Sequence, residues 1–247
     1  MIPGKEIHRS YDHFGAVRVH DDGQKRYLSF GAVDEQSCVL KSEPMVPQHE
    51  YTRIMLLVLL WSTPKRVLSL GLGAGALNTC LHHALPAAKQ EVVEIRPAVV
   101  EAAYRYFQLP RGKRLVVHTQ DAVAFVEADL SQRYDVIFSD IYEESGVNED
   151  QLSHAYIEGC LNKLKPQGWL VLNCWREHQS EALLSYLQNR CPDVRSCITQ
   201  SGNWVVFAGL SKTIETQKGL QVAAKALTPQ LGFSLQGYLR KLQFHRH

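Results

Sequence analysis

The chain has 247 residues, of which 45% are hydrophobic and 21% are charged, and its formal net charge is +2. This is the composition of an ordinary soluble globular protein, and the length fits one large domain or one domain with a small appendage. The scattered basic residues argue against nucleic-acid binding driven by bulk charge, and the longest apolar stretch, residues 54–61, is far too short to span a bilayer.

The cysteines and the N-terminus point to the cytoplasm. The six cysteines show no CxxC pair and no framework spacing, so we expect buried free thiols in a reducing compartment. The first 15 residues lack the apolar core of a secretory signal. His82 and His83 are adjacent and would point apart on a helix, and we expect no metal site.

The first 40 or so residues predict short strands. The segments 16–20 and 25–30 flank Asp21-Asp22-Gly23, a hairpin turn signal, and residues 37–41 could add a third strand. From residue 50 to residue 61 dense apolar residues without strand punctuation predict one mostly buried helix. We therefore expect a small N-terminal β-hairpin region at residues 1–48, followed by a larger second domain at residues 49–247.

From residue 66 onward, predicted strands alternate with predicted helices. The strands are 66–70, 91–95, 114–118, 134–140 and 169–175, and the helices are 76–85, 97–107, 122–129, 151–164 and 177–189. Two strands, 194–199 and 204–210, follow without a helix between them, so the last should run antiparallel to its neighbour. Helical patterning returns at 220–227 and 235–242, and the last four residues are expected to fray.

This order predicts a doubly wound, mostly parallel seven-stranded α/β sheet with a terminal antiparallel hairpin. Such a hairpin is typical of the class I S-adenosylmethionine-dependent fold rather than of a plain dinucleotide-binding fold.

Gly71, Gly73 and Gly75 follow a strand and open a helix, where the absence of side chains lets a ligand touch the backbone. The loop "GLGAGA" alone leaves three alternatives: a dinucleotide site, an S-adenosyl site, or a tight turn that binds nothing.

Three acids end successive strands of the alternating region, and the ends of such strands form the ligand crevice of an open α/β sheet. A carboxylate at Glu94 can accept hydrogen bonds from both ribose hydroxyls, and one at Asp121 can accept from the exocyclic amine of adenine. Asp140 ends the next strand. Each acid alone could be a helix N-cap. A dinucleotide enzyme would explain Glu94 and leave Asp121 and the terminal hairpin unexplained.

From about residue 67 to residue 210 the chain resembles the spermidine synthases, or polyamine aminopropyltransferases. The likeness is carried by "GLGAGA", "VVEIRPAVVEAAYRYF", "QDAVAFV", "YDVIFSDIYEESG", "LKPQGWLVLN" and "GNWVVFAG". It implies transfer of an aminopropyl group from decarboxylated S-adenosylmethionine to a di- or polyamine, with release of methylthioadenosine. It also suggests a homodimer with a small-molecule amine substrate, while the charge and the short apolar stretch predict no nucleic-acid or membrane partner.

The resemblance also implies residue roles. Asp140 would be the base that orients and deprotonates the amine, and Glu94 and Asp121 would hold ribose and adenine. The remaining nucleoside contacts would be Gly71, Gly73, Gly75, Ile95 and Ala122. On the amine side Gln36 sits where the family often has a glutamine at the start of its substrate region, and Glu143 replaces a second aspartate that holds the polyamine. Apart from the resemblance, Tyr142 lies beside Asp140 in the sequence and could cover a bound amine.

Two positions depart from the family pattern. Ala74 stands where the family has a loop aspartate that meets the aminopropyl ammonium, which is the physical case for S-adenosylmethionine as donor and for a methyltransferase. In "PQHEYTRIM" either Tyr51 or His49 takes the place of the tyrosine that lines the amine site, and Tyr51 is favoured because a phenol adds no positive charge. Glu50 is an alternative there. A nucleoside-binding relative without catalysis is the remaining hypothesis.

Overall fold

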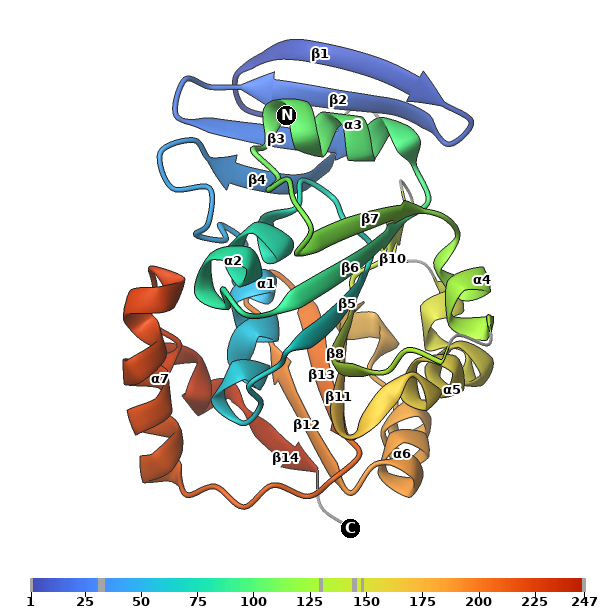
Figure 1. Cartoon of the computed structure of the whole chain (residues 1–247), viewed down its shortest axis with the longest axis vertical. Helices are drawn as coiled ribbons and strands as arrows, with labels where there is room; N and C mark the ends of the chain where they lie inside the picture. The colour runs from blue at the N-terminus through green and yellow to red at the C-terminus, as the bar shows by residue number, and fades with distance from the viewer. Residues whose placement is uncertain (1, 31–33, 129–130, 144–145, 148, 246–247) are drawn as a thin grey trace.

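The computed structural model describes residues 2–30, 34–128, 131–143, 146–147 and 149–245 (Figure 1). Its two main sheets are a four-stranded sheet at the N-terminus and an eight-stranded central sheet, and a short two-stranded ribbon joins β9 (Tyr142–Glu143) to β10 (Gly146–Val147).

The N-terminal sheet is an antiparallel meander in which each strand pairs with the next. Its strands are β1 (Lys5–Asp12), β2 (Gly15–Asp21), β3 (Lys25–Phe30) and β4 (Asp34–Leu40). The predicted turn between β2 and β3 is confirmed: Gly23 has a φ of +98°, and its amide donates to Asp21 Oδ1 at 2.7 Å. β1 was not among the predicted strands. Its sequence, KEIHRSYD, is mostly polar because it is an edge strand with one exposed face.

The central sheet has the order β14-β12-β13-β11-β8-β5-β6-β7. These strands are β5 (Arg66–Leu70), β6 (Lys89–Glu94), β7 (Leu115–Thr119), β8 (Tyr134–Ser139), β11 (Leu164–Trp175), β12 (Asp193–Ile198), β13 (Asn203–Gly209) and β14 (Gln243–His245). The neighbouring strands β7, β6, β5, β8 and β11 pair in parallel, and β13 runs antiparallel to both β11 and β12. The mostly parallel sheet and the terminal antiparallel hairpin are therefore confirmed, with one strand more than predicted.

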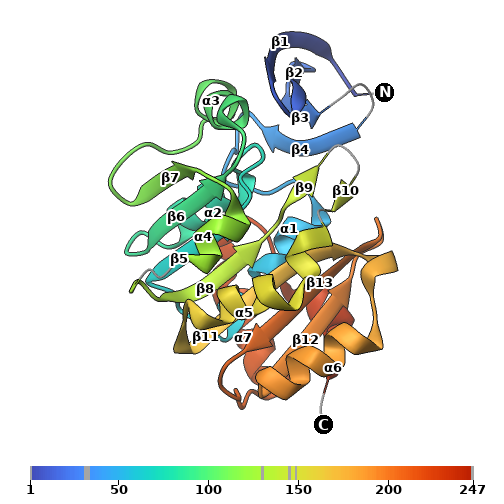
Figure 2. The ribbon, with the colours of Figure 1, turned by 90° about the vertical axis from the view of Figure 1, so that its right-hand side faces the viewer.

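Helices cover both faces of this sheet, as Figures 1 and 2 show. One face carries α1 (Glu50–Met55), η1 (Leu56–Leu60), α2 (Ala76–Ala84), α7 (Gln217–Leu231) and η4 (Gln236–Lys241). The other carries α4 (Ala122–Glu127), α5 (His154–Asn162) and α6 (Glu181–Arg190). Alternate strand residues enter the two cores: Phe138 packs with the first set and Ile137 with the second.

The N-terminal sheet packs against α3 (Pro97–Tyr106) rather than standing apart. Val17, Val19 and Leu28 point inward from β2 and β3 and form one apolar cluster with Ala102 of α3. Ala74 of the glycine loop belongs to the same cluster, so this contact also fixes the loop. The division of the chain at residue 48 stays a prediction.

Some boundaries differ from the predicted ones. The helix predicted over residues 50–61 is two elements, α1 and the 3₁₀ helix η1, whose residues are all buried. The helix predicted from residue 177 begins at Glu181, because Ser180 caps it by accepting from the Leu183 amide at 3.2 Å. A 3₁₀ turn, η3 (Arg176–His178), precedes it. Likewise η2 (Glu149–Leu152) precedes α5, whose cap is Ser153.

The expectation that the last four residues fray is wrong for Phe244 and His245, while residues 246 and 247 fall outside the described residues. β14 pairs antiparallel with β12 and adds the eighth strand. Beside it Arg195, only 1% exposed, donates to Asp193 Oδ2 at 2.7 Å and to Glu215 Oε2 at 3.0 Å. Its guanidinium lies 5.0 Å from the centroid of the Phe244 ring. The pairing with β12 and the contact between Arg195 and Phe244 hold β14 on the sheet edge.

Candidate active site

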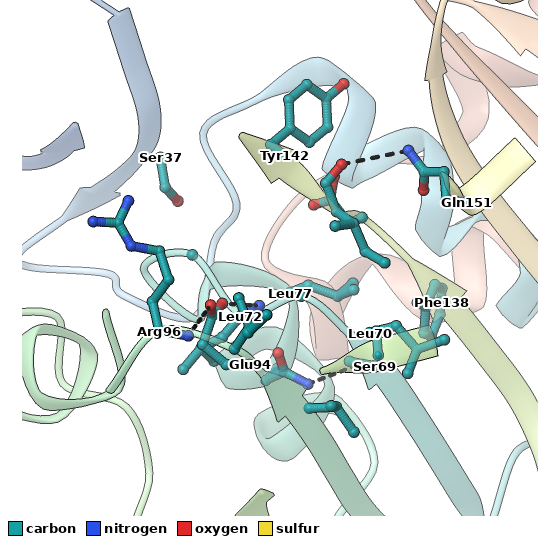
Figure 3. A pocket seen from close by; sticks show the side chains of 18 of the residues that line it. Ser37, Ser69, Leu70, Leu72, Leu77, Glu94, Arg96, Phe138, Tyr142 and Gln151 are labelled. Carbon is teal, nitrogen blue, oxygen red and sulfur yellow. Dashed lines mark hydrogen bonds between the residues drawn. The ribbon is translucent and has the colours of Figure 1, made fainter. Parts of the chain in front are cut away.

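A cavity of about 690 Å³ lies at the carboxyl ends of β5, β6 and β8 (Figure 3). The predicted site residues that line it are Tyr51, Gly71, Gly73, Glu94, Ile95, Asp121, Ala122, Asp140 and Tyr142. The N-terminal sheet adds Phe14, Phe30 and Ser37. In Figure 3 Glu94 and Arg96 lie toward one end of the cavity, and Tyr142 and Gln151 lie toward the other.

The three loop glycines serve different purposes. At Gly71, where φ is +93°, a Cβ would lie 2.2 Å from the backbone oxygen of Asp140. At Gly75 a Cβ would lie 2.5 Å from Leu109 Cδ1, and Gly75 is not among the cavity-lining residues. Gly73 lines the cavity, and a Cβ there would make only ordinary van der Waals contact, with Ser37 Cβ the nearest atom at 3.7 Å. Two of the glycines therefore permit close approach of protein atoms, and Gly73 leaves room for a ligand.

Glu94 sits at the end of β6, where two backbone amides hold its carboxylate (Figure 3). The Leu72 amide donates to Oε2 at 3.1 Å, and the Arg96 amide donates to Oε1 at 2.9 Å. Burial raises the pKa of Glu94, while the backbone amides of Arg96, Leu72 and Gly73 act in the opposite direction. Each oxygen has a second lone pair, so the same carboxylate can accept from two hydroxyls of a ligand.

Asp121 has both of the roles that the sequence allowed. It is the N-cap of α4, and its Oδ1 accepts from the Ala124 amide at 2.8 Å. It also lines the cavity together with Ala122. A capping carboxylate engages the helix through one oxygen, so the cap and a contact with a ligand amine are compatible.

Asp140 follows β8 and lines the cavity with a buried carboxylate. Its Oδ1 accepts from Asn173 Nδ2 at 2.8 Å, and the hydroxyl of Tyr51 also donates to the carboxylate. Burial raises the pKa of Asp140 from 3.8 to about 6, even though both donors favour the charged form. A carboxyl group with this pKa can take up a proton from a substrate near neutral pH.

Asn173 and Asn203 were missed in the sequence, and they hold the polar end of the cavity in place. The Tyr142 hydroxyl accepts from Asn173 at 3.1 Å and from Asn203 at 2.9 Å. Asn203 Nδ2 also donates to Asn173 Oδ1 at 3.2 Å. Both asparagines interrupt apolar strands, "WLVLNCW" and "GNWVVF", and a buried amide inside such a run was the signal that could have identified them.

The structure separates the alternatives at residues 49–51. Tyr51 lines the cavity, and its ring lies 6.5 Å from that of Tyr142. His49 stacks on Tyr51 at a centroid distance of 5.5 Å and is not among the cavity-lining residues, and burial lowers its pKa. Glu50 pairs with Lys241 and accepts from the Gln200 amide at 2.9 Å, so it anchors the C-terminal segment instead.

Three further predicted positions lie outside the cavity or outside the described residues. The backbone of Gln36 lies in β4 and that of Glu143 in β9, while the side chains of both fall outside the described residues. The Ala74 methyl group is fully buried in the apolar cluster with Val17 and Val19, and Ala74 is not among the cavity-lining residues. The loop therefore presents no carboxylate to the cavity at that position.

Neither a metal-binding group nor a membrane-spanning helix is found among the described residues. Within the described ranges no group of three or more His, Cys, Asp or Glu side chains could hold a metal ion. Among those same residues no helix has both the length and the apolar character needed to cross a membrane.

Comparison with known proteins identifies relatives along most of the chain. The polyamine aminopropyltransferase of Chromobacterium violaceum is 27% identical over 235 residues, which cover 92% of this chain and 89% of the relative. A probable spermidine synthase from Corynebacterium glutamicum superposes with a TM-score of 0.77 at 18% identity, covering 100% of this chain and 91% of that one. That structural likeness is one of fold.

Methyltransferases are a second class of relative, and they match a smaller part of the chain. The eEF1A lysine and N-terminal methyltransferase homolog of Drosophila melanogaster is 40% identical over 178 residues, which cover 66% of this chain and 26% of the relative. Residues 48–212 match the model of the spermine/spermidine synthase domain, which is about two thirds of the chain. The chain therefore belongs to the spermine/spermidine synthase family.

Proposed function

We propose that the protein transfers an aminopropyl group from decarboxylated S-adenosylmethionine to a di- or polyamine and releases methylthioadenosine. The observation that carries this proposal is the Asp140 carboxylate, which Asn173 and Tyr51 hold in the cavity and whose pKa burial raises to about 6. The polyamine aminopropyltransferases among its relatives support the same reaction class.

The nucleoside would occupy the end of the cavity at Glu94. Glu94 would accept from the two ribose hydroxyls, and Asp121 would accept from the adenine amine, with Ile95 and Ala122 beside the base. Gly73 gives the donor room beside the loop, and Gly71 holds the loop against Asp140. This arrangement would place the sulfonium between the glycine loop and Asp140.

The reaction needs a neutral amine next to the donor methylene. Asp140 would take a proton from the acceptor ammonium, and the nitrogen lone pair would then attack the methylene carbon. The carbon–sulfur bond breaks, its electron pair goes to sulfur, and neutral methylthioadenosine leaves. Tyr51 and Tyr142 would orient the amine and keep its nitrogen aligned with the methylene, and the cavity would exclude water. Gln36, His49 and Glu143 stay predicted amine-side residues.

The turnover rate should depend on the protonation of Asp140. Because the unprotonated carboxylate is the active form and its pKa is about 6, kcat should fall about tenfold per pH unit below that value. Above it, the rate should reach a plateau. A pH profile of kcat measured at saturating amine checks this, and a profile that stays flat down to about pH 4.5, well below that pKa, would mean that another group accepts the proton.

A methyltransferase is the second candidate. Ala74 leaves the loop without a carboxylate, and this loss removes repulsion toward a donor that keeps its own carboxylate group. The similarity to a lysine and N-terminal methyltransferase homolog favours the same candidate. On this alternative S-adenosylmethionine itself would be the donor, and Asp140 would again deprotonate an amine.

The experiment that separates the candidates incubates the purified protein with each donor and a panel of di- and polyamines. Methylthioadenosine and an aminopropylated amine, detected by mass spectrometry, are the expected products with decarboxylated S-adenosylmethionine. S-adenosylhomocysteine and a methylated amine from the other donor would identify a methyltransferase instead. Tight nucleoside binding without either product would identify a non-catalytic relative. We also propose that the protein is a homodimer and lies in the cytoplasm. Its mass in solution checks the first point, and its location in cells checks the second.

A further inference from the structure

The turn between β1 and β2 reaches the cavity from the N-terminal sheet. Phe14, at the tip of this turn, lines the cavity and is 39% exposed. Ile95, which follows the nucleoside carboxylate Glu94, also lines the cavity and is 38% exposed. Two large apolar side chains thus remain partly exposed around the same cavity, where a flat ligand could bury them.

A buried ion pair holds this turn in place. Arg96 Nε donates to Asp12 Oδ2 at 3.1 Å, and its terminal nitrogen donates to Asp12 Oδ1 at 2.9 Å and to the Gly15 carbonyl at 3.0 Å. The Arg96 and Asp12 side chains are only 7% and 10% exposed. Such a two-point pair fixes the orientation of both groups as well as their separation.

The same residues connect the turn to the nucleoside end of the cavity. The Phe14 amide donates to Asp12 Oδ1 at 3.0 Å, and the Arg96 guanidinium lies 5.8 Å from the Phe14 ring centroid and 4.5 Å from that of Phe30. The Arg96 amide in turn donates to the Glu94 carboxylate. Arg96 therefore contacts both the carboxylate that would hold the ribose and the turn that carries Phe14.

We propose that the β1–β2 turn is a nucleoside clamp, in which Phe14 covers the adenosine part of the donor while Arg96 and Asp12 hold the turn over it. Phe14 is then a donor-binding residue, and Arg96 and Asp12 are positioning residues. The inference rests on the proposed function only in taking an adenosine sulfonium or thioether as the ligand.

The test measures binding of methylthioadenosine and of S-adenosylhomocysteine by titration calorimetry. Phe14→Ala should weaken both by about tenfold, the range of a lost aromatic contact with a base, and Phe14→Tyr should keep the affinity. Arg96→Met should weaken binding to a similar extent. Adding Phe14→Ala to Arg96→Met should cost little more, because the turn is already released. In kinetic assays both single variants should raise the donor KM and leave kcat nearly unchanged.

Arg26→Met is the matched control. Arg26 also ties the N-terminal sheet to α3, by donating to the Tyr106 carbonyl at 2.7 Å, yet it is not among the cavity-lining residues. It should leave nucleoside affinity unchanged. Parent-like binding by Phe14→Ala, which removes an exposed side chain and should fold, would overturn the clamp while leaving the proposed function intact. If the unaltered protein binds neither nucleoside, the proposed function fails and the clamp fails with it.

Discussion

Asp140→Asn is expected to lower kcat by about 10²–10⁴-fold, the usual contribution of a general base, while nucleoside affinity stays close to that of the parent. The amide keeps the shape of the side chain and can still accept from Asn173, but it cannot take up a proton from an ammonium group. Release of methylthioadenosine measures kcat, and calorimetry with methylthioadenosine measures nucleoside affinity.

Asp135→Asn is the control for this prediction. Asp135 lies near the start of β8, whereas Asp140 follows its end, and Asp135 pairs with Lys165 at 2.8 Å. The control removes one negative charge from the same strand, far from the cavity, and should leave turnover intact. Turnover by Asp140→Asn at the parent rate would remove Asp140 from the mechanism.

Asp140→Asn should also be more stable than the parent protein at neutral and higher pH. The folded-state pKa of Asp140 is raised from 3.8 to about 6, so the native protein binds this proton more tightly than the unfolded chain. Folding stability therefore declines as the pH rises between these two values, by a total on the order of 3 kcal/mol. Thermal unfolding should show a higher Tm for Asp140→Asn at about pH 8, with the difference shrinking toward about pH 4. An equal rise in Tm at both pH values would mean that the added stability does not come from the raised pKa of Asp140.

Gly71→Ala is expected to destabilise the protein by at least about 3 kcal/mol, more than its left-handed φ alone would cost. The added Cβ would meet the Asp140 backbone oxygen at 2.2 Å, and neither backbone can move without breaking the junction of β5 and β8. Denaturant unfolding measures the loss. Reduced turnover should accompany it, since Asp140 is displaced.

Gly73→Ala separates the demands of the fold from those of the ligand. Its φ of +54° costs a non-glycine residue only about 1–2 kcal/mol, and its Cβ has room beside Ser37. The variant should fold and lose nucleoside affinity, because the methyl group would occupy space next to the donor. Equal loss of stability in Gly71→Ala and Gly73→Ala would contradict this division of roles between the glycines.

Much of the architecture could be predicted because the local pattern and the tertiary structure agree. The buried strands β5 and β8 are short, nearly continuous apolar runs, as expected of strands covered on both faces. In a parallel sheet the residues that follow such strands meet at one edge. For that reason the strand pattern alone predicts that Glu94 and Asp140 share one cavity, and both do line it.

Other features depend on residues that are far apart in the chain. The short β14 becomes a strand because β12 offers it an open edge, and Arg195 holds it there. The helix predicted over residues 50–61 is an α-helix followed by the 3₁₀ helix η1. All residues of η1 are apolar and buried, so packing against the surrounding core sets its backbone geometry. Local propensity contains no information about the edge of β12 or about the core residues that surround η1.

The sequence by itself determined the α/β fold class, the glycine loop and the carboxylates at the strand ends, since each depends on residues close together in the chain. Only the tertiary structure decided that Tyr51 rather than His49 lines the cavity. It also decided that Gly71 packs against the Asp140 backbone, where a side chain would clash. It also decided that Arg96 meets Asp12, 84 positions away. Contacts of this kind form when distant segments pack together, and their geometry is set by the whole fold.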